Sequence, residues 1–271
     1  MPAKFKYAID EKTIAKRIAE GRGSGTGRSY IPWIYVHEVP SKGKSSIRGG
    51  WKTGREHHFL SFLEASYFYI LEWGDSIIDI REQFPLLPRE ETQAIATDLG
   101  VEHPKDTRTG VDIVITTDVV PTFETTHGSK IKARSVKYED DLKDQRTKEK
   151  QLIEKIYWSR RNVDWNVVTE KSILVPMVQN IQWLHKSRDL FGLFSNIEMN
   201  TLQDIKEKIL KHLPVTRQKL ADFTDALDEY FQVPPSTCLT MVKHLIANKK
   251  LVTNMEQVIH PCNVIKITLP R

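Results

Sequence analysis

Two acidic residues and a lysine in this 271-residue chain could carry out chemistry together. Asp118 follows the apolar run VDIVITT, so a carboxylate is expected near the end of a buried strand. Glu64 interrupts an otherwise apolar helical segment upstream. Lys137 comes 19 residues after Asp118, a spacing that suits a strand, a hairpin and a second strand. Since a buried carboxylate is costly unless it is paired or binds a metal, these positions form a candidate site.

An acid on one strand and a polar-x-Lys sequence on its neighbour are typical of metal-dependent phosphodiesterases. Carboxylates hold Mg²⁺, the metal lowers the pKa of a water molecule, and a lysine stabilises the charge that develops on phosphorus. Strand alternation places Lys137 on the same face as Ser135 and opposite Val136. The pattern also occurs by chance. A structural salt bridge for Asp118 and a solvated edge-strand lysine for Lys137 therefore remain open from spacing alone.

Other catalytic and metal-binding patterns find little support. There is no Gly-x-Ser-x-Gly motif, and the two cysteines, Cys238 and Cys262, lack metal-ligand spacing. The glycine-rich segment GRGSGTGR is not followed by Gly-Lys-Ser/Thr, so a P-loop is not expected. His57 and His58 are adjacent and would diverge on a helix, which favours a surface or packing role.

The elements that must position the site alternate between helix and strand up to about residue 170. This order predicts an α/β domain with a mixed sheet flanked by helices. We expect helices at 13–20, 57–73 and 139–161, and extended segments at 33–39, 77–80, 83–87, 111–120, 123–125, 130–138 and 165–169. The turn THGS predicts a hairpin between 123–125 and 130–138.

The rest of the chain has a different pattern, so we place a domain boundary between residues 170 and 171. Helices are expected at 173–190, 201–212, 217–231 and 236–247, followed by short strands at 251–254 and 264–269. Helices followed by a small β-hairpin predict a mainly helical winged helix-turn-helix domain over residues 171–271.

Charge is distributed unevenly. Residues 1–55 carry 12 basic and 4 acidic side chains, residues 56–170 carry 15 and 22, and residues 171–271 carry 13 and 9. A basic N-terminal arm is typical of a polyanion-binding protein, although a solvated surface gives the same counts. The sequence shows no secretory signal and no long apolar run, and two cysteines suit a reducing compartment, so we expect a cytoplasmic protein without a membrane segment.

Several blocks of the sequence resemble the TnsA family, the endonuclease subunits of heteromeric bacterial cut-and-paste transposases. The most specific block is DIREQFPLLP at residues 79–88. The others are YIPW at 30–33, HHFLSFLE at 57–64, TTD at 116–118, SVKY at 135–138 and the charged helix with Arg146, Lys150, Tyr157 and Trp158. These blocks cover about residues 12–170, and residues 243–254 are similar to the family's C-terminal part.

The resemblance implies a restriction-endonuclease-like fold and a Mg²⁺-dependent site, with Mn²⁺ as a possible substitute. By motif, Glu64 and Asp118 would be metal ligands, the Val136 carbonyl a further ligand, and Lys137 the catalytic lysine. Ser135 stands where the family has Gln, and its shorter hydroxyl makes direct coordination doubtful. Glu154 matches another acid implicated in the family; from the pattern alone, a salt bridge on the helix surface is the simpler role.

The resemblance also implies partners. They are double-stranded transposon-end DNA, a TnsB-like transposase and a TnsC-like ATPase bound through the C-terminal domain. The expected recognition helix has only Lys243 and His244 as basic groups, which favours protein docking over base reading. Two alternatives stay open: a freestanding restriction or repair nuclease with the same site, and a DNA-binding adaptor whose nuclease site has decayed at Ser135.

Overall fold

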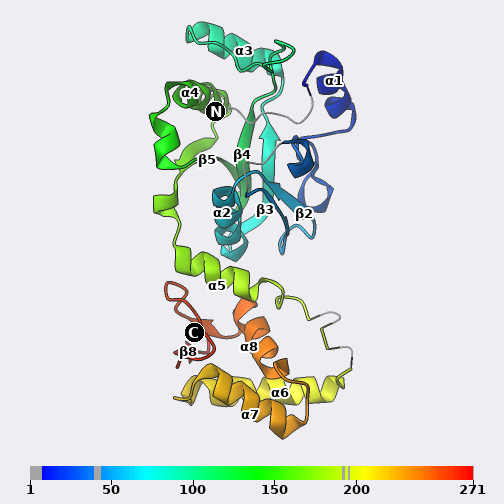
Figure 1. The fold of residues 1–271 in the computed structure, drawn as a ribbon, viewed down its shortest axis with the longest axis vertical. Helices are drawn as coiled ribbons and strands as arrows, with labels where there is room; N and C mark the ends of the chain where they lie inside the picture. Colours follow the sequence, from blue (N-terminus) through cyan, green and yellow to red (C-terminus); the bar gives the residue numbers. More distant parts are fainter. Residues whose placement is uncertain (1–7, 40–43, 191–192, 195, 271) are drawn as a thin grey trace. The chain divides into compact units, whose positions relative to one another are not determined.

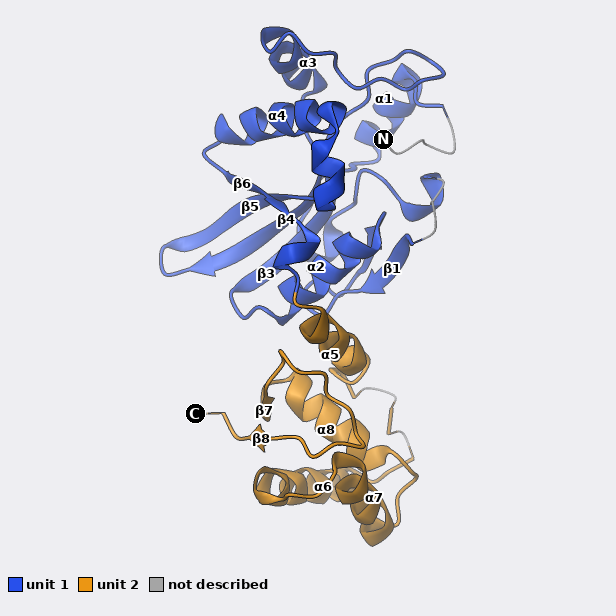
Figure 2. Ribbon diagram, turned by 60° about the vertical axis from the view of Figure 1, so that its left-hand side comes forward, with its two compact units in different colours: residues 1–173 blue, residues 174–271 orange. Residues whose placement is uncertain are grey.

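The computed structural model describes residues 8–39, 44–190, 193–194 and 196–270. The chain forms two compact units, Met1–Ile173 and Leu174–Arg271, which Figure 2 colours separately. Each unit is considered by itself. In the described part of the chain, no helix is long and apolar enough to cross a membrane.

Unit 1 is built on a four-stranded mixed sheet of order β3-β4-β5-β6 (Figure 1), and Figure 2 labels all four strands. The strands are β3 (Ile77–Pro85), β4 (Thr116–Thr125), β5 (Gly128–Val136) and β6 (Asp164–Val168). β3–β4 and β4–β5 are antiparallel, and β5–β6 is parallel because helix α4 (Gln145–Ser159) lies between them in the chain. The expected mixed α/β architecture and the hairpin between β4 and β5 are therefore confirmed.

Three further helices and a small β-ribbon complete unit 1. They are α1 (Glu11–Ala19), α2 (Phe62–Trp73), α3 (Arg89–Asp98) and the antiparallel pair β1 (Ser46–Gly49) and β2 (Glu56–Phe59). The main core joins α3 and α4 to the sheet through buried residues that include Ile95, Ile153, Trp158, Val120 and Ala133. Neither α3 nor β1 was expected from the sequence.

The sequence-based start of α2 is wrong, because residues 57–59 form β2 and the helix begins only at Phe62. Ser61 is the N-cap, and its hydroxyl accepts a hydrogen bond from the Glu64 amide at 3.1 Å. The apolar residues of HHFLSFLE therefore belong to a strand and then a helix, divided by a capping serine.

Two other expected elements have different bounds. The helix expected at 139–161 is a 3₁₀ turn, Glu139–Lys143, followed by α4, because Asp144 caps α4 by accepting from the Thr147 amide at 2.9 Å. The strand expected at 111–120 begins at Thr116, and the extended segments expected at 77–80 and 83–87 form one strand, β3.

The N-terminal segment is folded into unit 1, so the expected basic arm is wrong for the described residues; residues 1–7 and 40–43 lie outside them. Ile9, Ile14, Trp33 and Ile34 are buried in one apolar cluster with Val114. Residues 33–39 do not form a strand. The chain turns in a short 3₁₀ segment at 36–38 because the Glu38 carboxylate accepts from the Tyr35 amide at 3.0 Å.

Three of the five arginines among residues 1–55, Arg17, Arg22 and Arg55, are paired inside the unit. Arg22 forms a salt bridge with Glu38 at 2.8 Å, and Arg55 forms one with the buried Glu82 at 2.6 Å. These guanidinium groups are therefore used in folding and are not presented to a polyanion.

The described residues of unit 2 form four α-helices and a short antiparallel strand pair, as the sequence predicts. The elements are α5 (Val175–His185), α6 (Met199–His212), α7 (Leu220–Phe231), α8 (Thr237–Ala247), β7 (Val252–Thr253) and β8 (Ile267–Thr268). Its interior includes the fully buried Ile205, Ile209, Val242 and Leu245. Classification of this unit as a winged helix-turn-helix stays a prediction.

Candidate functional site

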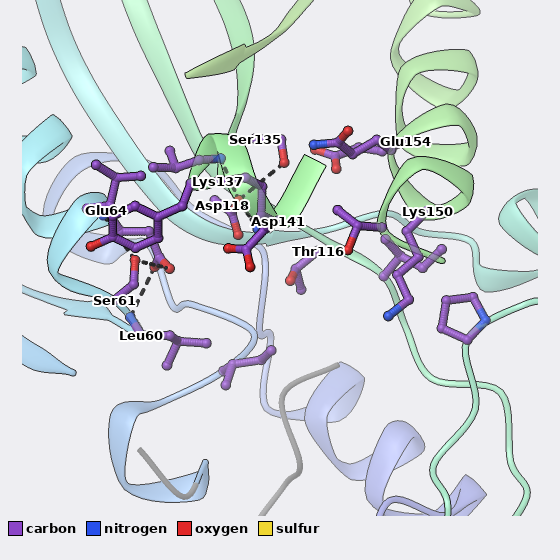
Figure 3. A pocket seen from close by; sticks show the side chains of 18 of the residues that line it. Leu60, Ser61, Glu64, Thr116, Asp118, Ser135, Lys137, Asp141, Lys150 and Glu154 are labelled. Atoms are coloured by element: carbon purple, nitrogen blue, oxygen red, sulfur yellow. Dashed lines mark hydrogen bonds and ion pairs between the residues drawn. The ribbon is translucent and has the colours of Figure 1, made fainter. Parts of the chain in front are cut away.

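A cavity of about 350 Å³ opens between the N-terminus of α2, the sheet and α4 (Figure 3). All the residues that the sequence singled out line it: Glu64, Asp118, Ser135, Val136, Lys137 and Glu154. Glu64 comes from the first turn of α2, Asp118 from β4, and Glu154 from α4. Ser135 and Val136 end β5, and Lys137 follows directly. Four elements that are separate in sequence therefore bring these groups together.

The Glu64 carboxylate is held by the first turn of its own helix. Its Oε2 accepts from the Leu60 amide at 3.0 Å, and its Oε1 accepts from the Ser61 hydroxyl at 2.9 Å. Ser61 and Glu64 thus satisfy each other's polar groups around a helix N-terminus, much as in a capping box. This sequence signal, Ser-x-x-Glu, fixes both the start of α2 and the direction of the carboxylate.

The Asp118 carboxylate is the centre of the polar contacts. Its Oδ2 accepts from the Lys137 amine and from the Val136 amide, both at 2.6 Å, and from the Ser135 hydroxyl at 3.3 Å. The alternative that Lys137 is a solvated lysine on an edge strand is therefore wrong. The other alternative is a structural salt bridge for Asp118. Asp118 does form a salt bridge, with Lys137, and both residues line the cavity.

Glu154 is buried, with 5% of its surface exposed, so the expected salt bridge on the helix surface is wrong. Its Oε1 accepts from the Thr117 hydroxyl at 2.7 Å, and that hydroxyl in turn accepts from the Trp158 indole at 2.7 Å. Because α4 lies against the sheet through Ile153, Tyr157 and Trp158, the neighbouring Glu154 is turned inward.

The Asp118 carboxylate repels the carboxylates of both Glu64 and Glu154 in the cavity. Burial and the negative charge of Asp118 raise the pKa of Glu64 to about 7, and the same two causes raise the pKa of Glu154 to about 7. Burial alone would lower the pKa of Lys137, but the charges of Asp118 and Glu64 raise it above its usual value. Lys137 is thus held as a cation, and one lysine does not neutralise this cluster.

Gln83 supports the site, although the sequence analysis did not single it out. Its Nε2 donates to Glu64 Oε2 at 3.1 Å, and the side chain is 1% exposed. Its φ of 48° lies in the left-handed region, which is uncommon for a residue other than glycine. The pairing of β3 with β4 includes Glu82↔Val119 and Phe84↔Thr117, so Gln83 and Asp118 occupy facing positions in the sheet.

Two charged residues that were also missed line the cavity. Asp141 comes from the 3₁₀ turn after β5, and Lys150 comes from α4, as Figure 3 shows. Periodicity along α4 offered a signal for Lys150, since it lies four residues before Glu154 and therefore on the same helix face. Asp141 sits in a charged run, EDDLKD, in which no spacing distinguishes one acid from another.

The two adjacent histidines lie outside the cavity lining. His57 is fully buried, with its Nδ1 2.8 Å from Glu82 Oε2 and its Nε2 2.7 Å from the Thr53 hydroxyl. Burial alone would raise the pKa of Glu82, but hydrogen bonds from Arg55 and His57 lower it to about 2. His57 therefore packs inside unit 1 as part of a buried polar cluster, in which Glu82 of DIREQFPLLP is the shared acceptor.

The donor set of the cavity fits a hard divalent cation. Mg²⁺ is usually bound by one or two protein carboxylates, with water and phosphate oxygens filling its other positions. Glu64 and Asp118 supply two carboxylates, and a cation beside them would favour the charged form of Glu64, whose pKa burial and the charge of Asp118 raise. Among the described residues, no group of three or more His, Cys, Asp or Glu side chains is arranged to hold a metal ion. The cavity therefore fits a Mg²⁺ site in which the protein supplies few of the metal ligands.

Comparison with known proteins gives consistent matches along the chain. The family model for the TnsA-like endonuclease N terminus matches residues 74–170, and that for the TnsA endonuclease C terminus matches residues 172–255. The first match includes Asp118, Lys137 and Glu154 and begins after Glu64.

A curated relative covers a similar share of the chain. "Transposon Tn7 transposition protein TnsA" of Escherichia coli is 45% identical over 183 residues, which are 68% of this chain and 66% of the relative. The alignment thus spans just under two thirds of the relative's length. Two successive matches to models of one family, together with this identity, show that the chain belongs to the TnsA endonuclease family.

Proposed function

We propose that this protein is a divalent-metal-dependent endodeoxyribonuclease that cuts DNA at the 5′ ends of a transposon during cut-and-paste transposition. The observation that carries the proposal is the convergence of Glu64, Asp118 and Glu154 with Lys137 in one cavity. Family membership and the name of the relative, a transposition protein, support the biological setting. We place this activity in the bacterial cytoplasm.

Glu64, Asp118 and the Val136 carbonyl would hold the metal, and we propose Mg²⁺, with Mn²⁺ as a substitute. Glu154 is a candidate for a further contact to the metal or its water. The bound cation would lower the pKa of a water molecule and offset charge on the scissile phosphate. Ser135 donates to Asp118 in this structure, so its hydroxyl would orient that carboxylate rather than bind metal.

Lys137 supplies a compact positive charge beside the reacting phosphate. Its amine pairs with Asp118 at 2.6 Å, and the neighbouring carboxylates keep it protonated. When the water oxygen attacks phosphorus, negative charge grows on the phosphate oxygens, where a fixed cation is most stabilising. The P–O3′ bond then breaks, leaving a 5′-phosphate and a 3′-hydroxyl.

We propose that unit 2 docks a TnsC-like ATPase and that a TnsB-like transposase acts with this chain on double-stranded transposon ends. The basic groups of α8 support protein docking over base reading. The Lys243 amine lies 4.7 Å from the centre of the Trp183 ring, and His244 Nδ1 lies 3.1 Å from the Ser187 carbonyl oxygen. Both side chains are engaged within unit 2.

The test is cleavage of a plasmid that carries transposon ends, with the partner proteins and Mg²⁺. We expect Asp118→Asn and Lys137→Ala to abolish 5′-end cutting, and chelation of the metal to do the same. Asp140→Asn is the matched control, because Asp140 is an exposed acid paired with Lys143. Folding of each variant is checked by circular dichroism and thermal unfolding.

The outcomes separate the proposal from its alternatives. Cutting by the wild-type chain alone, without partners, would indicate a freestanding nuclease. Transposition that proceeds with 5′ ends uncut, and unchanged by Asp118→Asn, would indicate an adaptor without nuclease activity.

A further inference from the structure

The cavity contains two lysines, and their surroundings differ. Lys137 is paired with Asp118 at 2.6 Å. Lys150 is partly buried, and the described residues give it no hydrogen bond or ion pair. Burial and the positive charges of Arg146 and Lys137 lower its pKa to about 8. The charge of Asp144 opposes this shift, but the described residues place no hydrogen bond or ion pair between Asp144 and the Lys150 amine. A cationic group that is partly buried in a cavity without a hydrogen-bonded partner favours an anionic ligand, because an unpaired charge is costly to bury.

The face of α4 that borders the cavity carries several polar groups. Thr147, Lys150, Gln151 and Glu154 all line the cavity, and their spacing of three, four and seven residues places them on one side of the helix. Gln151 Nε2 is buried and has no hydrogen-bond partner among the described residues. Two donors, one of them cationic, therefore line the α4 side of the cavity, together with Thr147 and Glu154.

The distribution of charge in the cavity indicates where an anionic ligand could bind and which kind of anion it would be. Four carboxylates line it, those of Glu64, Asp118, Asp141 and Glu154, so an anion entering on that side would be repelled. Figure 3 shows Lys150 extending from α4, apart from the Asp118–Lys137 pair. A DNA strand crossing the cavity could place one phosphate at the carboxylate-bound metal and an adjacent phosphate at α4.

We infer that Lys150, assisted by Gln151, binds a backbone phosphate of the DNA strand being cut and so holds the scissile phosphate in line with Asp118 and Lys137. This inference rests on the proposed nuclease function and adds a substrate-binding residue to that site. An ammonium group is suited to this contact because it presents a compact charge with three donors.

A chemical footprint tests the contact without requiring cleavage. Only the neutral amine of a lysine reacts with acetic anhydride, so at about pH 7, below the Lys150 pKa, a bound phosphate that raises this pKa by one unit slows its acetylation about tenfold. In the complete transposase assembly with Ca²⁺, we expect the transposon-end duplex to protect Lys150 by this amount, measured by mass spectrometry, and to leave Lys148 unchanged. Lys148 is the matched control because it is exposed on the same helix. Inorganic phosphate alone should protect Lys150 much less, and equal protection by it would indicate a general anion site.

Cleavage assays with variants test whether the contact between Lys150 and the phosphate is needed for fast cutting. We expect Lys150→Met to slow single-turnover cutting in the complete transposase system by about 100-fold, with partial rescue by Lys150→Arg and no effect of Lys148→Met. A wild-type chain that never cuts would refute the proposed function. If the wild type cuts and Lys150→Met matches Lys148→Met, or if Lys150 is acetylated equally with and without the duplex, only the inference about Lys150 is refuted.

Discussion

Glu64 and Glu154 make the stability of the metal-free protein depend on pH. Their pKa values are raised to about 7 in the folded protein, whereas a glutamate in an unfolded chain titrates near pH 4.5. Between these values the folded state binds more protons than the unfolded state, so stability falls as pH rises. The two carboxyl groups are therefore stabilising when protonated and destabilising when charged.

We expect the free energy of unfolding in EDTA to decrease between about pH 5 and pH 7.5, by about 2 to 3 kcal/mol for each glutamate. Denaturant titrations at several pH values measure this change. The double variant Glu64→Gln/Glu154→Gln should remove most of it, and Mg²⁺ should stabilise the wild type more at pH 8 than at pH 5.5. A wild-type profile that parallels that of the double variant would show that these glutamates are not the titrating groups.

Ser135 is predicted to contribute little to catalysis, because its hydroxyl already donates to Asp118 at 3.3 Å. Ser135→Ala should reduce the cleavage rate about tenfold, or roughly 1.4 kcal/mol in the barrier. Ser135→Gln, which restores the family's residue and extends an amide toward the cavity, should match or exceed the wild-type rate. If Ser135→Ala is as damaging as Asp118→Asn in the same assay, the serine has a direct catalytic or metal-binding role.

Gln83 combines a backbone conformation and a side-chain contact that mutation can separate. Glycine adopts its φ of 48° without strain, whereas alanine does not. We expect Gln83→Gly to be about 1 kcal/mol more stable than Gln83→Ala, because a left-handed conformation costs a non-glycine residue about that much. Denaturant unfolding measures this difference.

Both Gln83 variants lose the hydrogen bond to Glu64, so both should cut DNA more slowly than the wild type by a similar factor of about ten. Unequal rates that follow the stability of the two variants would instead assign the effect to backbone strain.

At the scale of elements, the N-terminus of α2 joins helix formation to the orientation of Glu64. Ser61→Ala removes both the N-cap and a donor to the carboxylate, and should destabilise the protein by about 1 kcal/mol while also slowing cleavage. Ser61→Thr keeps both contacts and should restore cleavage. Asp10→Ala removes the N-cap of α1 outside the cavity lining and should leave the cleavage rate unchanged. Equal slowing by Asp10→Ala would attribute the effect to general destabilisation.

At the scale of the whole molecule, the charge distribution predicts dependence on partners. Residues 56–170 carry 22 acidic and 15 basic side chains, and Arg22 and Arg55 are used in internal ion pairs. The acidic excess of residues 56–170, which contain the site, weakens the attraction of DNA to this part of the chain, since non-specific affinity comes from neutralised phosphates. The isolated chain should therefore show almost no cutting in Mg²⁺ and gain activity with TnsB-like and TnsC-like partners. Strong, sequence-independent cutting by the chain alone would contradict this prediction.

Several features could be predicted from the sequence because local patterns encode them. The β-branched run before Asp118 and the turn before residue 130 indicated two strands and their hairpin, and an acid at a strand end with Lys137 on the next strand indicated the site. The helices of unit 2 followed from apolar periodicity. In each case, neighbours in the sequence carry the signal, because strand and helix periods relate residues only a few positions apart.

Only the tertiary structure decided the rest. Glu154 is buried and Lys150 borders the cavity because α4 packs on the sheet, and Gln83 reaches Glu64 because β3 passes α2. The basic N-terminal segment joins the core because Trp33 and its neighbours bury apolar surface against Val114. These outcomes depend on contacts between residues far apart in the chain, and a carboxylate or ammonium group has the same local pattern whether its helix later covers it or leaves it in water.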